Sequence, residues 1–542
     1  MAEVVADPRP LLAVLVSAVA VVLIVASYRH PNVRETWSVI AAVAKFGIIA
    51  SMLPGVLDGT HYEWRFEGFV AGVDFGLRAD PLGMLFALLA SFLWIFTSFY
   101  AAGYMRGLDE HAQTRFFAAF AASLSTAVGI AFASNLLTIF VFYELLSLVT
   151  YPLVAHNEDD EARIAGRKYL AYTFFGGGVL LLGGTVLTYW LTAGVGDPTL
   201  AFQAGGIDAL ETVATEDPLY AQVAFGLLAA GFGVKAAVMP VHSWLADAMV
   251  APTPVSGLLH AVAVVKAGAF GVARVILDVF GPEVTGDLGM NLVLAALAAF
   301  TLVAASVIAL RKDHLKRRLA YSTTAQLSYI VLGLSLLHPL AILGALFHIP
   351  AHAFGKLTLF FCAGAIHVET HVDYVSDMAG IGRRMPLTMS AFTIGAAGMA
   401  GMPLIAGFVS KFYMLVGGLS AGYWPFALAL IVSGVLNVMY FWPIVYTAFF
   451  ETPDSHDPKP VYEHGPGGVN EGQPPMADGG HHGPSTDGWE YHSPLEESTW
   501  LMVLPIAIIA TGAVLLGVVP DLAVFFDIAA MVVEDVTGEV VP

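Results

Sequence analysis

The chain has few charged residues and a single cysteine. Only 12% of its 542 residues are charged, whereas an ordinary soluble domain has about 25%. Cys362 stands alone in an apolar segment, which excludes a disulfide framework and a cysteine-ligated metal site. CxxC pairs, Walker loops and Fe–S, flavin or haem motifs are also absent, so we expect no bound cofactor. The acidic start, MAEVVADPRP, does not resemble a cleavable signal peptide.

Long apolar runs dominate instead, and 57% of the residues are hydrophobic. Runs of about 18 or more apolar residues are typical of membrane-spanning helices. We therefore predict an all-α polytopic membrane protein with about fourteen spans. These lie near 10–27, 36–54, 81–102, 116–133, 135–154, 168–193, 220–240, 255–278, 288–310, 318–337, 340–366, 386–416, 424–450 and 499–519. The segment 521–536 is apolar but short, and we expect it on the surface. The net charge of -19 does not suggest a nucleic-acid partner.

The distribution of Lys and Arg between the loops predicts the orientation. The loop 311–318, RKDHLKRR, is the strongest cytoplasmic signal. Alternate spans then place four further Lys/Arg-containing loops on that side, namely 28–35, 103–115, 155–168 and 367–385. The opposite loops 194–219, 279–287 and 417–423 have no Lys or Arg, although Arg65 and Arg78 in loop 55–80 are exceptions. This count predicts that both termini lie outside.

Two loops have distinctive compositions. Loop 55–80 alternates aromatic residues and contains glycines, which predicts an outer β-hairpin. Loop 451–497 is polar and rich in Gly, Pro and His, which favours a flexible cytoplasmic insertion. Its histidines are compatible with metal binding, but no acid or cysteine accompanies them at a fixed spacing. These histidines are His456, His464, His481, His482 and His492.

One apolar stretch, 222–245 (QVAFGLLAAGFGVKAAVMPVHSWL), has a lysine near its centre. An ammonium at that depth is costly unless it is paired, hydrated or deprotonated, so Lys235 is a candidate functional residue. The alternative is a lysine whose stem extends to the interface. Glu144 lies about halfway across the span 135–154. The two residues are natural electrostatic partners, either for proton transfer or as a purely structural buried pair.

Titratable residues also occur in three later spans. His260 and Lys266 occur in APTPVSGLLHAVAVVKAGAFGVAR, where the histidine is either a hydrogen-bonded core residue or part of a proton relay. His348, His352 and Lys356 are spaced i, i+4, i+8, so they share one helix face. That spacing suits a proton wire, or a two-histidine metal site for which no third ligand is evident.

Lys411 stands alone in GMAGMPLIAGFVSKFYMLV, where glycines and Pro403 are expected to interrupt the helix. The form of Gly231–Lys235, GFGVK, recurs as GFVSK at Gly407–Lys411. Paired interrupted helices in two halves are typical of transporters built from repeats. Buried lysines and histidines can exchange protons near neutral pH, so these residues together predict proton transfer through a membrane.

Roughly residues 80–450 resemble the antiporter-like subunits shared by respiratory complex I and Mrp cation/proton antiporters. The resemblance is carried by NLLTIFVFYELLSL, GFGVKAAVMPVHSWLADAMVAPTPVSGLLHAVAVVKAG, DHLKRRLAYSTTAQLSYI, HIPAHAFGKLTLFFCAGAI and GMPLIAGFVSKF. It implies two inverted five-helix repeats, each with a broken helix. It also implies that the proton-transferring residues are Glu144, Lys235, His260, Lys266, His348, His352, Lys356 and Lys411. We expect Pro240, His242, Asp247 and Pro403 to support them, and no metal site.

The expected organisation has five parts. These are 1–115 (first helices and outer loop), 116–278 and 288–450 (the two repeats), 451–497 (polar cytoplasmic loop) and 498–542 (last span and tail). The ending LNVMYFWPIVYTAFFE is most similar to the Mrp D-type subunit, and we expect neither the lateral helix of the large complex I subunit nor the further spans of the long Mrp subunit.

The resulting hypothesis is an ion translocator rather than an enzyme. It would lie in a prokaryotic plasma membrane, bound to small membrane subunits and to a homologous antiporter-like subunit, and would exchange H⁺ for Na⁺. One rival is a proton-pumping module of a redox-driven complex, either complex I-like or a membrane-bound hydrogenase, or of a bicarbonate-uptake complex. A second rival is a non-conducting scaffold, which would not need to keep so many costly intramembrane charges.

Overall fold

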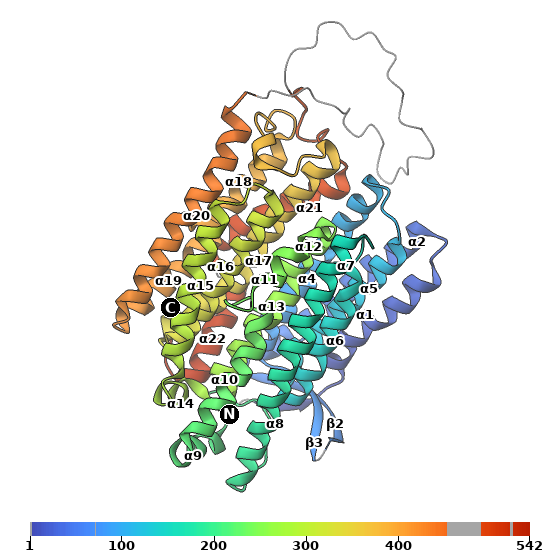
Figure 1. Cartoon of the computed structure of the whole chain (residues 1–542). Coiled ribbons are helices and arrows are strands. Elements are labelled where there is room, and N and C mark those ends of the chain that lie inside the picture. The colour runs from blue at the N-terminus through green and yellow to red at the C-terminus, as the bar shows by residue number, and fades with distance from the viewer. Residues whose placement is uncertain (1–2, 71, 453–488, 521–523) are drawn as a thin grey trace, which may run out of the picture.

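The computed structural model describes residues 3–70, 72–452, 489–520 and 524–542, and most of them are helical. Long helices lie side by side along one direction (Figure 1). The first half contains α1 (Arg9–Ala26), α2 (Pro31–Ala50), α3 (Leu53–Leu57), α4 (Pro81–Gly107), α5 (Gln113–Phe132), α6 (Leu136–Val154), α7 (Asp160–Leu170), a π-helical turn η1 (Ala171–Gly177), α8 (Gly178–Gly194), α9 (Asp208–Glu216), α10 (Pro218–Lys235), α11 (Ser243–Asp247), a 3₁₀ turn η2 (Ala248–Val250) and α12 (Thr253–Gly257).

The second half continues with π-helical turns around α13. Its elements are η3 (Leu258–Val262), α13 (Val264–Arg274), η4 (Val275–Val279), α14 (Gly281–Asp287), α15 (Met290–Leu310), α16 (Leu315–Ser335), α17 (Pro339–Thr370), a 3₁₀ turn η5 (Val375–Asp377), α18 (Pro386–Ala400), α19 (Ala406–Ser420), α20 (Trp424–Phe450), α21 (Trp500–Val518) and α22 (Phe525–Thr537).

Ten helices in the described part of the chain are long and apolar enough to cross a membrane. The prediction of a mostly helical, multi-span membrane protein is therefore confirmed at this level. The four predicted spans outside these ten fall on α10, α12 with α13, α16, and α18 with α19. Of these, α10 stops at Lys235, two are interrupted, and α16 begins with the polar sequence LKRRLAYSTTAQ. All four segments are therefore helical. They differ from the ten candidate spans because their helices are short, interrupted or partly polar.

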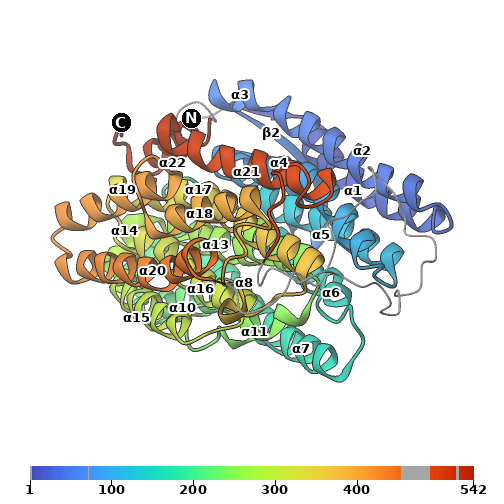
Figure 2. The ribbon, with the colours of Figure 1, turned by 90° about the horizontal axis from the view of Figure 1, so that it is seen from above.

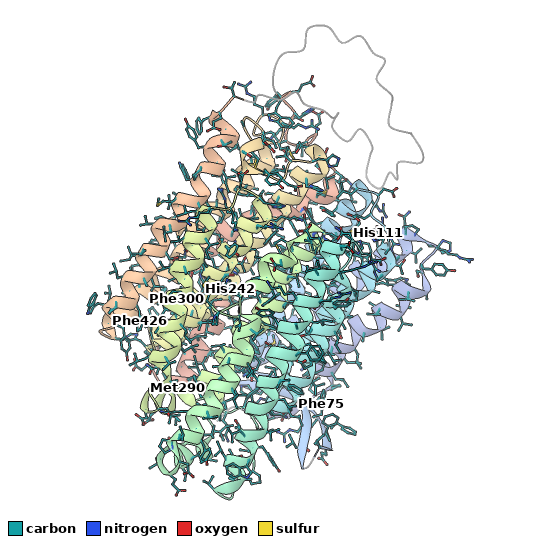
Figure 3. All side chains as sticks on the ribbon, in the orientation of Figure 1. Phe75, His111, His242, Met290, Phe300 and Phe426 are labelled. Carbon is teal, nitrogen blue, oxygen red and sulfur yellow. The ribbon has the colours of Figure 1, made fainter. Side chains whose placement is uncertain are left out.

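The bundle has a buried centre and an apolar exterior. Helix α17 is buried throughout its apolar window, more than any other candidate span. Large apolar side chains on outer helices are exposed, among them Val186 and Phe300, and Figure 3 labels Phe300 on the outside of the bundle. An exposed apolar surface of this kind suits lipid contact. The short helix α22 packs its apolar face on α17, where Phe526 contacts Phe347.

The predicted grouping of loops agrees with the structure. Hairpin β2–β3 and helices α9 and α14, which belong to three predicted outer loops, lie at the same end of the bundle (Figure 1). The five Lys/Arg-containing loops contact one another through Arg34 with Gln113, Arg106 with Glu35, Arg115 with Glu158, Arg317 with Glu161, and Asp313 with Ser376. Such contacts require these loops to share one surface.

The predicted hairpin is present and has a partner strand. Strand β2 (Thr60–Val70) pairs antiparallel with β3 (Val73–Ala79), with Trp64 opposite Leu77. Strand β1 (Glu3–Ala6), which the sequence did not indicate, pairs in parallel with β2 and completes a sheet of order β1-β2-β3. Arg65 pairs with Glu63 within the sheet. Arg65, one of the two arginines that opposed the orientation rule, is therefore locally neutralised.

Most of the polar loop 451–497 lies outside the described residues, including His456, His464, His481 and His482. Its last part is packed on the bundle. Trp489 is buried and donates to the Ala379 carbonyl at 2.8 Å. Glu497 is buried and accepts from the backbone N–H groups of Leu387 and Thr388 at 2.9 and 2.8 Å. Its carboxyl thereby caps the first turn of α18.

The Glu497 carboxyl predicts a pH-dependent stability. Burial raises its pKa to about 7, against the opposing effect of its hydrogen bonds to Thr388 and Leu387. The folded state therefore holds this proton to higher pH than the unfolded chain. The stabilisation is complete below about pH 4.5 and is lost as pH rises to about 7, and the shift corresponds to ~3 kcal/mol. We expect Glu497→Gln to flatten the fall of Tm between pH 5 and 8, measured in detergent. The exposed neighbour Glu496→Gln should leave the fall unchanged, and equal profiles for both variants would contradict the assignment.

Candidate functional site

Lys235 is the last residue of α10, at the point where the helix breaks. Ala237 has a positive φ of 55°, and helix resumes only at α11. A cation at a helix C-terminus is favoured by the helix dipole. His242, in the interruption, is labelled about half way along the bundle in Figure 3. The predicted break is therefore present, and it leaves Lys235 deep within the molecule.

The Lys235 side chain is completely buried, so the alternative that its stem extends to the membrane interface is wrong. Its Nζ donates to the backbone carbonyl of Tyr143 and lies 3.4 Å from the centre of the Tyr143 ring. The Tyr143 hydroxyl in turn donates to the Gly231 carbonyl at 2.8 Å. These bonds join α6 and α10 directly beside Glu144.

Glu144 interacts electrostatically with Lys235 but does not touch it. No ion pair within 4.0 Å joins them in the described chain. The Glu144 carboxyl lies against Gly178 of α8, and its Oε1 is buried without a hydrogen-bond partner. The predicted partners are therefore close enough to interact electrostatically, but they form no direct ion pair. One oxygen of the Glu144 carboxylate, Oε1, has no hydrogen-bond partner.

A methyl group at Gly178 should disturb this site. A Cβ there would lie 2.6 Å from the Glu144 carboxyl, which would have to move. If the predicted proton transfer takes place here, Gly178→Ala should lower it by up to about tenfold, because small displacements of reacting groups are costly. Gly183→Ala on the same helix is the matched control, since its Cβ meets only Leu227 Cδ1 at 3.8 Å. Equal transport by the two variants would argue against a role for the Glu144 position.

Lys266 and His352 form the closest contact among the predicted residues. Lys266 Nζ lies 2.6 Å from His352 Nδ1, and both side chains are completely buried. Helix α13 brings Lys266 to this position immediately after the π-helical turn η3, which carries His260. Such turns are frequent at functional sites. The His260 ring packs on Phe360 at 4.8 Å, and neither of its nitrogens has a hydrogen-bond partner in the described chain.

The predicted shared face of α17 continues from this contact. The rings of His352 and His348 are 6.0 Å apart. His348 donates from Nε2 to Gln326 Oε1 at 2.9 Å, and its Nδ1 is hydrogen-bonded to the Ser410 hydroxyl at 2.7 Å. Lys356, one turn beyond His352, donates to the Leu319 carbonyl at 2.9 Å. The two histidines face different partners, so no two-histidine metal site is formed among these groups.

Lys411 lies beside the second interruption. Helix α18 ends at Ala400, Gly401 and Leu404 have positive φ values of 85° and 73°, and α19 begins at Ala406. Lys411 Nζ donates to the Met399 carbonyl at 2.5 Å and borders a cavity of about 180 Å³. Lys411 follows the helix interruption beside it, whereas Lys235 precedes the interruption beside it. The similar sequences GFGVK and GFVSK therefore do not occupy equivalent structural positions.

The Met399 carbonyl is a shared acceptor at the end of α18. Besides Lys411, it accepts from Gln326 Nε2 at 3.2 Å and from Asn437 Nδ2 at 3.0 Å. Gln326 is the residue that also accepts from His348. The C-terminal end of α18, where the helix is interrupted, is thus linked through Gln326 to the face of α17 that carries the histidines.

The predicted supporting residues take different positions. Asp247 pairs with Lys168 at 2.5 Å, and the His242 ring lies 6.3 Å from that of Tyr321. Pro240 lines an apolar cavity of about 190 Å³ in the first interruption. Pro403 lies in the second interruption, between α18 and α19. Asp247 therefore lies at the edge of the site rather than among the central residues.

Several buried charges were missed by the sequence interpretation. Lys45 in α2 is completely buried and donates to the Leu124 carbonyl at 2.8 Å. Arg274 pairs with Asp80 and Asp278, each at 2.7 Å. Lys45 stands alone among apolar residues as Lys235 does, and Arg274 and Asp278 have helical i, i+4 spacing. The sequence pattern could therefore have indicated both the buried lysine and the buried ion pair.

Comparison with known proteins gives consistent results. Residues 133–437 match the family described as NADH:quinone oxidoreductase/Mrp antiporter, transmembrane. NADH-quinone oxidoreductase subunit N of Desulforudis audaxviator (strain MP104C) is 33% identical over 429 residues, which cover 78% of this chain and 82% of that protein. The probable K(+)/H(+) antiporter A/B subunit of Rhizobium meliloti (strain 1021) is 32% identical over 436 residues, 78% of this chain but only 41% of that protein.

The fold also matches a solved structure. The Mrp complex from Dietzia sp. DQ12-45-1b contains a chain that superposes with a TM-score of 0.78 over 98% of both chains, at 20% identity. At this identity the likeness concerns the fold alone.

Proposed function

Since the chain belongs to the NADH:quinone oxidoreductase/Mrp antiporter transmembrane family, we propose that it moves protons across the membrane along its buried Glu, Lys and His residues. The observation that carries this proposal is the 2.6 Å contact between Lys266 and His352 at the centre of the bundle. Two buried nitrogen bases at hydrogen-bond distance can exchange a proton directly.

The central residues form one electrostatically connected group. His352 interacts with Lys266, Lys356, His348 and His260. His348 and Lys356 both interact with Lys411 as well. A proton placed on one residue therefore changes the free energy of protonation of the next. This arrangement supports stepwise transfer from Lys266 through the α17 histidines towards Lys411.

Glu144 and Lys235 form the proposed loading site. In the described chain no hydrogen bond or ion pair joins Lys235 to Lys266, so a proton would need water to pass between them. The interruption after Lys235 takes the chain out of regular helix, and non-helical backbone of this kind can line a water-filled cavity in a protein interior. The free Oε1 of Glu144 gives an arriving proton an acceptor.

We further propose that the chain is the D-type subunit of a multisubunit Na⁺/H⁺ antiporter, beside small membrane subunits and a homologous subunit. The ending 436–451 supports this assignment, and the fold shared with a chain of the Mrp complex is compatible with it. On this proposal the chain has fourteen spans, inverted repeats at 116–278 and 288–450, and both termini outside a prokaryotic plasma membrane. The role of each site residue is part of the same proposal.

The second candidate is a proton-pumping subunit of a redox-driven complex. The similarity to NADH-quinone oxidoreductase subunit N favours it, because that relative is matched over most of its length. The same residues would then carry protons, while a partner would supply the electron chemistry. A bicarbonate-uptake complex would use the membrane residues in the same way.

One experiment distinguishes these assemblies. The chain is expressed with the products of its neighbouring genes, and everted vesicles are energised to form a pH gradient. An antiporter should dissipate the gradient on addition of NaCl, whereas a redox-driven pump should acidify vesicles only when its electron donor is supplied. Dissipation by Na⁺ that is lost with Lys235→Ala would support the antiporter, and its absence in the assembled complex would contradict the Na⁺/H⁺ assignment.

A further inference from the structure

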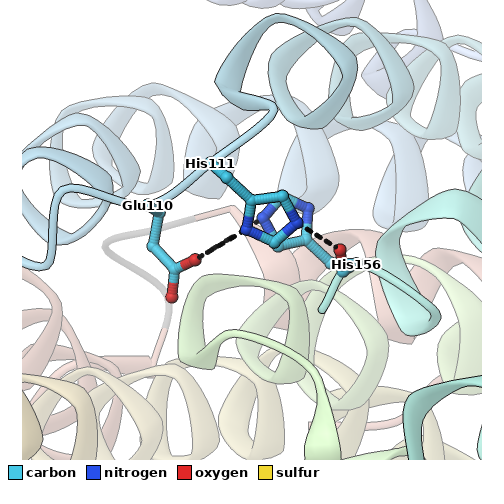
Figure 4. A group of neighbouring side chains, drawn as sticks. All are labelled: Glu110, His111 and His156. Atoms are coloured by element: carbon cyan, nitrogen blue, oxygen red, sulfur yellow. Dashed lines mark hydrogen bonds and ion pairs between the residues drawn. The ribbon is translucent and has the colours of Figure 1, made fainter. Parts of the chain in front are cut away.

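A His–His–Glu cluster lies at the Lys/Arg-rich end of the molecule, away from the proposed proton path. Glu110 and His111 belong to the connection between α4 and α5, and His156 directly follows α6 (Figure 4). One donor atom from each residue lies within 4.8 Å of the other two. Glu110 Oε2 is 3.7 Å from both His111 Nδ1 and His156 Nε2, which is too long for a hydrogen bond.

His156 is the observation that points to a ligand. Its side chain is completely buried, yet neither ring nitrogen makes a hydrogen bond within the described residues. A buried polar group without a partner is costly and calls for an unseen water or ion. Its Nε2 faces the Glu110 carboxyl.

The backbone selects the nitrogen that His111 presents. His111 Nε2 is 3.0 Å from the His156 carbonyl oxygen, which can only accept, so Nε2 carries the proton and donates. In the neutral imidazole, Nδ1 on the Glu110 side therefore keeps its lone pair. A hydrogen bond from the second nitrogen to a carbonyl is the usual arrangement for a histidine that binds a metal.

We propose that Glu110, His111 and His156 bind a divalent transition metal of the Zn²⁺ class. Two imidazoles and one carboxylate are a recognised ligand set for Zn²⁺, with water in the fourth position. Donor atoms on a tetrahedral zinc are ~3.3 Å apart, so the cluster has to contract by roughly 0.4 to 1.5 Å. The half-exposed His111 side chain and the loop position of Glu110 permit this, and they also give the metal access from solvent.

The surrounding charges are compatible with a cation. The nearby Arg115 donates to the His156 carbonyl at 2.9 Å, but its charge is paired with Glu158. A bound metal would tie the α4–α5 connection to the end of α6, the helix that carries Glu144. The site is independent of the proposed transport function.

The test is Zn²⁺ and Co²⁺ titration of the purified full-length chain in detergent. The histidines His456, His464, His481 and His482 can also bind metal, so each titration is repeated with all four replaced by asparagine. In both backgrounds we expect a Zn²⁺ site whose affinity falls at least about tenfold in Glu110→Gln and in His156→Gln, and it should be the one site left when the four loop histidines are replaced. Co²⁺ should give the visible absorption of a four-coordinate site that both variants lose.

The exposed histidine His30, at the same end of the bundle, supplies the control. His30→Gln should bind Zn²⁺ as the parent chain does. Glu110→Gln removes a partly exposed side chain, so it serves as the decisive variant if His156→Gln does not fold. Unchanged Zn²⁺ affinity in a folded Glu110→Gln chain, or binding lost entirely with the four loop histidines, would overturn the proposal.

Discussion

Replacing Lys235 by alanine is expected to reduce proton transport to background, a loss of at least about tenfold. The ammonium is buried and bonded to the Tyr143 carbonyl beside Glu144. Alanine removes both the proton carrier and the positive charge that interacts with the carboxylate. The measurement is the change of a pH gradient across vesicles, driven by Na⁺ or by the electron donor according to the assembly, and normalised to the amount of assembled protein.

A second buried lysine provides the matched control. Lys45 is as buried as Lys235 and also donates to a carbonyl, but it lies in α2, away from the proposed path. Lys45→Ala should therefore lower stability while keeping most of the transport. Wild-type transport by assembled Lys235→Ala would refute the path, and equal losses in both variants would show that the loss of any buried lysine is sufficient.

Breaking the Lys266–His352 contact should have the second large effect. Lys266→Ala and His352→Ala each remove one partner of the 2.6 Å contact, and each is expected to lower transport at least about tenfold. The double variant should be no slower than the slower single variant, because both changes block the same step. Residues that act as a unit show this non-additivity.

His367→Gln is the control for that series. It lies near the end of the same helix α17 and bonds to Asp373 at 3.0 Å, outside the line of transfer. Its transport should match the parent chain. Losses that simply multiply in the double variant would indicate that Lys266 and His352 act independently, which would contradict direct transfer between them.

The sequence predicted best those features that are visible within one short segment, such as a single charged residue in an apolar stretch. Lys235 and Lys411 are single charges in apolar stretches beside glycine and proline, and both lie at helix interruptions. The i, i+4, i+8 spacing placed His348, His352 and Lys356 on one helix, because helix geometry is local. The hairpin at 60–79 followed from alternation in the same way.

The features that escaped prediction depend on long-range packing. The spacing of His352 does not reveal that Lys266 is its partner, since the π-helical turn η3 changes the helix register just before that lysine. Glu497 caps α18 from a segment that composition describes as a polar linker. The unpaired position of the Glu144 carboxyl likewise depends on Gly178, a residue on another helix.

The backbone oxygen of Met399 has one further consequence. A carbonyl has two lone pairs, but three donors converge on this one, from Lys411, Gln326 and Asn437. The three therefore compete, and a weaker bond from Lys411 lets Gln326 bind more strongly. Because the other end of Gln326 accepts from His348, we expect a change in the charge of Lys411 to alter the hydrogen bond that the imidazole makes.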